Sequence, residues 1–175
     1  STPLYKAAEK GNVALVKVLI KAGGDVNQAK KNGASPLYVA SQYGMIGIVK
    51  ALIKAGSNVN QALTTTGVSP LWMASQKGFV DLVKVLINAS GNVNQARTGD
   101  GVSPLYIASQ NGHVDTAKVL LDAGSNVNHA ETTNGCTPLW MASQQGNVDT
   151  VKVLIKAGGN VNQALTTTGV SPLYI

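Results

Sequence analysis

The regular spacing of the prolines is the feature that most constrains how this chain can fold. Successive prolines are 33 residues apart once and then 34 residues apart four times: Pro3, Pro36, Pro70, Pro104, Pro138 and Pro172. Repetition at such an interval predicts a stack of similar units that bury one another's apolar sides. We therefore interpret residues 1–175 as one array, with repeats at 2–34, 35–68, 69–102, 103–136 and 137–170 and a partial sixth repeat at 171–175.

Each repeat has the pattern of two short helices followed by a long extended turn. In the third repeat, Ser69 can cap a first helix, Pro70 suits its first turn, and Gly78 can end it in a left-handed conformation. Apolar residues at helical spacing indicate a second helix over residues 80–88. Helices this short do not persist alone in water, so neighbouring repeats must cover them.

Composition excludes several classes of protein. The chain is 44% apolar and 13% charged, which is typical of a folded protein rather than a disordered one. No apolar run approaches the roughly 18 residues of a membrane-spanning helix, and we expect neither a secretory signal nor a transit peptide. Cys136 is the single cysteine, so no intrachain disulfide can form. These features favour an intracellular, cytoplasmic location.

The start of each first helix resembles the Thr-Pro-Leu-His-x-Ala signature of the ankyrin repeat family. The matching segments are Thr2–Ala7, Ser35–Ala40, Ser69–Ala74, Ser103–Ala108 and Thr137–Ala142. The segment Gly112–Leu121 resembles the family's Gly-His-x-x-Val-Val-x-x-Leu-Leu, and Gly24–Asn27 resembles its Gly-Ala-Asp-Val-Asn ending. The resemblance implies an all-α solenoid of stacked helix-turn-helix units with β-hairpin loops, and a non-catalytic role in protein–protein recognition through the concave face.

The chain departs from the family pattern in two ways. An aromatic ring replaces the signature histidine in every copy: Tyr5, Tyr38, Trp72, Tyr106, Trp140 and Tyr174. We expect these rings to belong to the core, with some Tyr hydroxyl or Trp N–H groups reaching hairpin carbonyls. The second departure is an extra residue in the turn, since Asn60 to Gly67 is one step longer than Asn27 to Gly33. The later hairpin tips should therefore bulge relative to the first.

One asparagine per repeat recurs in the extended turns: Asn27, Asn60, Asn94, Asn128 and Asn162. We predict that their amides form a ladder that ties successive turns together by satisfying open backbone groups. The family resemblance also leaves hydroxylation of these asparagines open, since a leucine stands eight residues earlier in three repeats (Leu52, Leu86 and Leu120).

A lysine stripe runs along the second helices: Lys17, Lys50, Lys84, Lys118 and Lys152. With a net charge of +6, such a stripe could follow nucleic acid or an anionic membrane. However, Asp81, Asp115 and Asp149 precede three of these lysines at ion-pairing distance on a helix. Arg97 is the only arginine, and no aromatic residues are interleaved. A solvated, partly paired face is therefore favoured over nucleic-acid or lipid binding.

No residue pattern predicts a catalytic, cofactor or metal site, and we expect no small-molecule substrate. His113 and His129 are isolated from other ligand types, whereas a metal site needs three or four donors at suitable spacing. Cys136 stands where other repeats carry valine and has no basic neighbour in sequence to activate it, so we interpret it as a small apolar substitute.

Positions that change between repeats are the candidates for partner recognition. At the end of the first helix these are Tyr43, Lys77, Asn111 and Gln145. The candidates at the hairpin tips are Leu63, Val68, Arg97 and Val102. An exposed aromatic beside cationic residues is a composition common in binding hot spots, although a chance surface substitution would explain Tyr43 equally well. The identity of the protein partner is not specified by these residues.

The two ends of the array differ. Lys6 occupies a slot that is apolar in the other repeats and suits a terminal cap, whereas the chain stops at Ile175 without a polar cap. Exposed apolar ends can associate with a second chain. A structural or self-assembling scaffold that stacks end to end is therefore the main alternative function.

Overall fold

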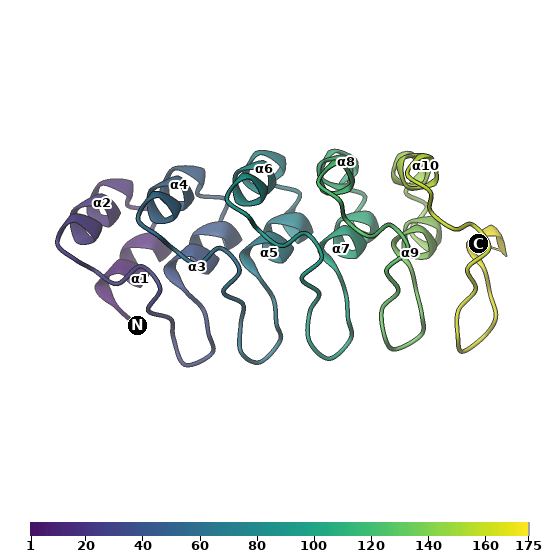
Figure 1. Ribbon diagram of the computed structural model, residues 1–175, viewed down its shortest axis with the longest axis horizontal. Coiled ribbons are helices and arrows are strands. Elements are labelled where there is room, and N and C mark those ends of the chain that lie inside the picture. The colour runs from purple at the N-terminus through teal and green to yellow at the C-terminus, as the bar shows by residue number, and fades with distance from the viewer. Residues whose placement is uncertain (175) are drawn as a thin grey trace.

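The computed structural model of the protein describes the backbone of residues 1–174 and the side chains of residues 1–173. Two rows of helices run along it (Figure 1). The first helices of the repeats are α1 (Pro3–Glu9), α3 (Pro36–Gln42), α5 (Pro70–Lys77), α7 (Pro104–Gln110) and α9 (Pro138–Gln144). The second helices are α2 (Val13–Lys21), α4 (Ile46–Lys54), α6 (Val80–Asn88), α8 (Val114–Asp122) and α10 (Val148–Lys156). A 3-10 turn, η1 (Pro172–Tyr174), follows the last loop.

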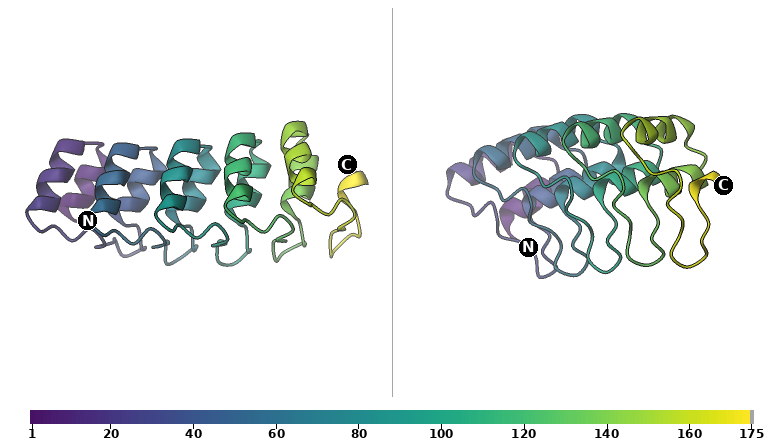
Figure 2. Two further views of the ribbon diagram at one scale, coloured as in Figure 1. Left: turned by 45° about the horizontal axis from the view of Figure 1, so that its top comes forward. Right: turned by 45° about the vertical axis from the view of Figure 1, so that its right-hand side comes forward.

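The long loops between repeats project to one side as a row of fingers, and the two helix rows stay in register along the array (Figures 1 and 2). The predicted all-α stack of helix pairs is confirmed. The fingers differ from expectation in one respect, because no regular strand occurs within residues 1–174. No helix in that range is both long and apolar enough to cross a membrane.

The first helices begin as the sequence predicts. The hydroxyl of Ser69 accepts the backbone N–H of Trp72 at 3.1 Å, and the Ser or Thr at the same position caps each of the other four first helices in the same way. Proline follows each cap. A backbone N–H at this position has no partner within the helix, so proline, which lacks the N–H, costs no hydrogen bond. Gly78 ends α5 with φ of +69°, the left-handed conformation that glycine adopts without steric cost.

The core lies between the two rows of helices and repeats with the chain. One leucine per repeat from the first helices (Leu37, Leu71, Leu105 and Leu139) and one from the second helices (Leu52, Leu86, Leu120 and Leu154) are fully or almost fully buried. Because each leucine sits between its own repeat and its neighbours, burial couples successive repeats.

The aromatic rings are buried, as predicted, for Tyr5, Tyr38, Trp72, Tyr106 and Trp140; the side chain of Tyr174 lies outside the described residues. The Nε1–H of Trp72 donates to the carbonyl of Val102 at 2.9 Å, and that of Trp140 donates to Val170 at 3.2 Å. Each tryptophan therefore ties a first helix to the finger base that precedes the next repeat, which confirms the prediction that indole N–H groups reach hairpin carbonyls.

Backbone hydrogen bonds close each finger and join it to the next. In the first finger, the Gly33 N–H donates to the carbonyl of Lys30, three residues earlier, at 2.9 Å. In the second finger, the Gly67 N–H donates to the carbonyl of Leu63, four residues earlier, at 2.8 Å. The wider turn confirms the predicted bulge. Between fingers, Thr64 N–H donates to the Asn32 carbonyl at 2.9 Å, and equivalent bonds join the later tips.

The turn asparagines bridge neighbouring repeats. Asn94 Nδ2 donates to the Gly124 carbonyl at 3.3 Å, and Asn94 Oδ1 accepts the Asn126 N–H at 2.9 Å. The same pair of bonds is made by Asn27, Asn60 and Asn128. The Asn162 side chain makes no hydrogen bond within the described residues. Four of the five predicted ladder residues thus form the ladder.

Candidate functional site

A groove of about 370 Å³ lies between the fingers and the first helices α7 and α9. The helices contribute Tyr106, Gln110, Trp140, Met141 and Gln144, and the fingers contribute Arg97, Asp100, Val102, Glu131, Thr133, Asn134, Cys136 and Leu165. We call the surface formed by the fingers and the first helices the concave face. The groove is therefore built from three successive fingers and two neighbouring helices.

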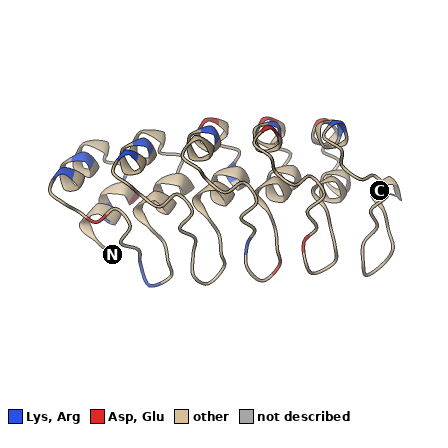
Figure 3. Cartoon of the chain, in the orientation of Figure 1, with Lys and Arg blue, Asp and Glu red and all other residues tan. Residues whose placement is uncertain are grey.

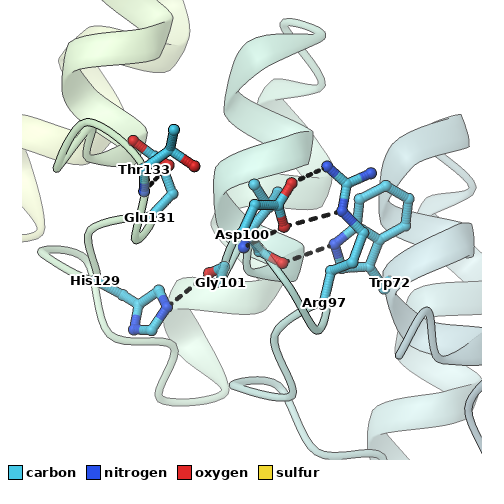
Figure 4. Close-up of polar contacts among 8 residues, drawn as sticks. Trp72, Arg97, Asp100, Gly101, His129, Glu131 and Thr133 are labelled. Carbon is cyan, nitrogen blue, oxygen red and sulfur yellow. Dashed lines mark hydrogen bonds and ion pairs between the residues drawn. The ribbon is translucent and has the colours of Figure 1, made fainter. Parts of the chain in front are cut away.

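One wall of the groove is an ion pair within a single finger (Figure 4). Arg97 Nε donates to Asp100 Oδ1 at 3.0 Å, and Arg97 Nη2 donates to Asp100 Oδ2. The guanidinium centre also lies 5.4 Å from the centroid of the Trp72 ring, within cation–π range. The hydrogen bonds from Arg97 lower the pKa of Asp100 and raise that of Arg97. Arg97 is thus held in place by internal contacts.

The next finger contributes a carboxylate that is enclosed by backbone. Glu131 is only 6% exposed, and its two oxygens accept N–H groups from Thr133 and Asn134 at 2.6 Å and from Cys136 at 3.1 Å. Burial alone would raise the pKa of Glu131, but the three N–H donors outweigh it and the pKa falls below its ordinary value. Glu131 therefore stays ionised and holds its own finger tip closed.

Cys136 lies at the buried base of the same finger. Burial, followed by the nearby Glu131 carboxylate, raises the pKa of the Cys136 thiol to about 11. A thiol with such a pKa is protonated near neutral pH and is a poor nucleophile. The geometry agrees with the interpretation of Cys136 as a small apolar residue.

The two histidines join repeats to each other. His113 Nε2–H donates to the Gln76 carbonyl at 3.0 Å, and His129 Nε2–H donates to the Gly101 carbonyl at 2.9 Å (Figure 4). A carbonyl can only accept, so the ring nitrogen carries the proton in each bond. Within the described part of the chain, no group of three or more His, Cys, Asp or Glu residues could hold a metal ion.

The predicted partner-binding residues fall into three groups. Tyr43, Lys77, Asn111 and Gln145 are exposed at the ends of α3, α5, α7 and α9, and Tyr43 is 56% exposed. They form a column with one residue per repeat. Leu63 and Arg97 are half-buried at the finger tips.

Val68 and Val102 correct the prediction, because their side chains are only 6% and 7% exposed. Both stand directly before a helix cap, where the finger returns to the helix rows and packs its valine into the core. These side chains therefore offer a partner little surface, although Val102 still lines part of the groove.

Sequence reasoning did not identify the roles of Asp100 and Glu131, which fix the shape of the groove. The available signal was weak: Asp100 stands three residues after Arg97, and Glu131 occupies a tip position that is leucine in two other fingers, Leu63 and Leu165. The same position in the first finger is Lys30, whose ammonium lies 4.0 Å from the Tyr5 ring centroid and 3.7 Å from Glu9. This tip residue thus folds back over the array in several repeats.

On the opposite side, the second helices form the back face, where the predicted ion pairs are present. Lys84, Lys118 and Lys152 pair with Asp81, Asp115 and Asp149 at 3.9, 3.0 and 3.1 Å. Figure 3 shows this mixture of charges on α6, α8 and α10. Solvated pairs of this kind contribute little stability, but they lower the net charge of the face.

Comparison with known proteins gives one consistent result. A family model described as ankyrin repeats (3 copies) matches residues 1–63 and 61–131, and a second model, described as ankyrin repeat, matches residues 134–164. No curated protein matches the chain.

Proposed function

Because the chain belongs to the ankyrin repeat family, whose repeats are generally protein–protein interaction modules, we propose that it is a non-catalytic binding protein. In this proposal a partner protein docks on the concave face. Ankyrin repeat proteins are typically binding modules rather than enzymes, and the raised pKa of the buried Cys136 thiol is consistent with that.

The observation that carries the proposal is the groove between the fingers and α7 and α9. Its walls are fixed before any partner arrives, since Asp100 holds Arg97 and three N–H groups hold Glu131. A surface that is already ordered loses little conformational entropy on binding. The amides of Gln110 and Gln144 line the groove and can each donate and accept hydrogen bonds to a partner.

The column at the ends of the first helices supplies a second part of the surface. It presents a different side chain in each repeat, with the aromatic ring of Tyr43 and the ammonium of Lys77 on neighbouring helices. Aromatic residues placed among polar ones are common hot spots of protein interfaces. We expect Tyr43 to contribute most of the affinity from this column.

A pull-down with the intact array tests the proposal, compared with a concave variant carrying Tyr43→Ala, Lys77→Ala, Gln110→Ala and Gln144→Ala. The matched control replaces the exposed back-face Lys84 by Ala. A partner of the concave face is lost from the concave variant and retained by the control. Equal retention by both proteins would contradict the proposal, and unchanged affinity of Tyr43→Ala alone would remove only Tyr43.

A second candidate function is end-to-end self-association. Val18 on α2 and Val148 on α10 are each 61% exposed, and Leu15 and Ile155 beside them are also exposed. The residues equivalent to Leu15 inside the array, such as Ile48 and Leu82, are fully buried against a neighbouring repeat. Sedimentation of the chain at several concentrations tests this candidate, and a strict monomer would exclude it.

A further inference from the structure

A second groove, of about 560 Å³, lies on the back face between α2 and α4. Its lining residues are Lys17, Ile20, Lys21, Gly47, Lys50, Ala51, Lys54 and Ala55. All four lysines are exposed, and every other lining residue is apolar or glycine. The groove thus combines an apolar floor with two flanking pairs of positive charges.

These four charges are not neutralised by the chain. In the third to fifth repeats an aspartate precedes the lysine by three residues, but Ala14 and Gly47 take that position in the first two repeats. None of the four lysines forms an ion pair with any residue described by the structure. Figure 3 shows only blue segments on α2 and α4, in contrast to the mixed colours farther along the same row.

The same chain contains a matched groove with a different charge. Between α8 and α10 lies a groove of about 400 Å³ lined by Lys118, Leu121, Asp122, Val153, Lys156 and Ala157. Here Asp122 lines the groove itself, and Asp115 pairs with Lys118 at 3.0 Å. The α8–α10 groove therefore has the same arrangement of helices as the α2–α4 groove but lacks its excess of positive charge.

We propose that the α2–α4 groove binds an acidic amphipathic helix of a partner protein. Lys17 and Lys21, like Lys50 and Lys54, are four residues apart and therefore about 6 Å apart along their helix. Glutamates at the same spacing on both edges of a partner helix would meet all four charges. The apolar side of the partner helix would cover Ile20, Ala51 and Ala55. Amphipathic helices commonly bind in this way, with their apolar face in a groove between helices.

Gly47 gives this floor its open shape. A Cβ built at Gly47 would have only one neighbour within 4 Å, the Cγ2 atom of Val13 at 3.8 Å, so nothing in the chain fills that space. The equivalent residue in the next repeat is Asp81, which carries both bulk and a negative charge. Because the second repeat has glycine where the third has aspartate, the α2–α4 groove is wider and lacks a negative charge at this position.

Charge along the back face favours a short protein segment over an extended polyanion. Beyond α4 the second helices carry Asp81, Asp115, Asp122 and Asp149, which a nucleic acid or membrane surface continuing along the array would meet. The groove also offers lysine rather than arginine and has no aromatic ring, whereas phosphate and base recognition favours both. A helix that lies in the groove parallel to α2 and α4 does not extend along the array toward these aspartates.

Fluorescence anisotropy with a synthetic peptide tests the proposal. The probe is a labelled amphipathic helix with a leucine face and glutamates four residues apart along both edges. We expect the intact protein to bind it at low salt, and the double variant Lys17→Glu/Lys50→Glu to bind at least tenfold more weakly. The matched variant Lys118→Glu/Lys156→Glu should change affinity less than twofold, and circular dichroism checks that both variants are folded.

Two further probes separate the alternatives. Replacing the leucines of the peptide by serine while keeping its glutamates should weaken binding at least fivefold, because the apolar floor loses its contact. No binding of the leucine peptide to the intact protein, or an equal loss in both double variants, would overturn the proposal. Vesicles containing phosphatidylserine or a single-stranded oligonucleotide that bind through Lys17 and Lys50 more tightly than the peptide would also overturn it.

Discussion

The asparagine ladder makes a quantitative prediction about coupling between repeats. Replacing Asn94 by alanine removes two hydrogen bonds, from Nδ2 to the Gly124 carbonyl and from the Asn126 N–H to Oδ1. Each hydrogen bond contributes about 1 kcal/mol net. Because the turn is exposed and water can partly replace the lost partner, we expect the free energy of unfolding to fall by about 1–2 kcal/mol.

Urea unfolding followed by circular dichroism measures this change. For an m-value of roughly 2 kcal/mol/M, the midpoint should fall by about 0.5–1 M. The lost bonds join the third repeat to the fourth, so weaker coupling between the two halves of the array can also lower the m-value.

The chain provides a matched control in Asn162. It occupies the same turn position, but its side chain makes no hydrogen bond within the described residues. Asn162→Ala therefore removes the same local turn preference without breaking a bond between repeats, and we expect a cost below about 0.5 kcal/mol. Equal losses of stability for the two variants would refute the ladder as a source of coupling.

Three other substitutions test contacts of the fingers. In urea unfolding, Gly67→Ala should destabilise the protein more than Gly169→Ala by at least about 1 kcal/mol. Both glycines have φ of +68°, but only a Cβ at position 67 would meet another group, the Thr98 backbone N at 2.7 Å. Trp72→Phe should lower stability by about 1–3 kcal/mol, because the Val102 carbonyl keeps only its bond from the Arg97 N–H and the smaller ring fills less of the core, whereas Tyr38→Phe, which breaks no observed hydrogen bond, should cost less. Glu131→Gln should lower stability near neutral pH, and its deficit relative to the parent chain should shrink as pH falls below about 4.5. The folded-state pKa of Glu131 is depressed, so the stability that its ionised form contributes is lost on acidification.

Much of the fold could be predicted because the same local signals recur at one interval. A Ser or Thr cap, a following proline and a turn glycine act through neighbouring backbone atoms, so their effect can be inferred from a few adjacent residues. The predicted second helix over residues 80–88 agrees with α6. The expected β-hairpins formed only as hydrogen-bonded turns. In the second finger, for example, the two arms share the bonds from Leu63 N–H to the Val68 carbonyl and from Gly67 N–H to the Leu63 carbonyl, too few for a ladder.

The groove could be predicted only in part, because its shape depends on pairings between side chains. The sequence placed Val102 and Arg97 alike in the tip of a finger, yet the finger turns Val102 into the core and leaves Arg97 stacked near Trp72. The orientation of a residue at the base of a finger follows from where the chain returns to the helices. A repeat pattern in sequence does not specify that direction.

The two faces differ in how their charges are compensated, and this difference bears on how each could bind. Arg97 and Glu131 on the concave face already have internal partners, so a protein docking in the groove between their fingers would bury few free charges. Binding that depends on shape and hydrogen bonds should respond weakly to salt. The lysines of the α2–α4 groove have no such partners among the described residues, and exposed charges are strongly screened once the Debye length falls to about 8 Å at physiological ionic strength. Salt dependence should therefore identify which face a given partner occupies, even before any variant is made.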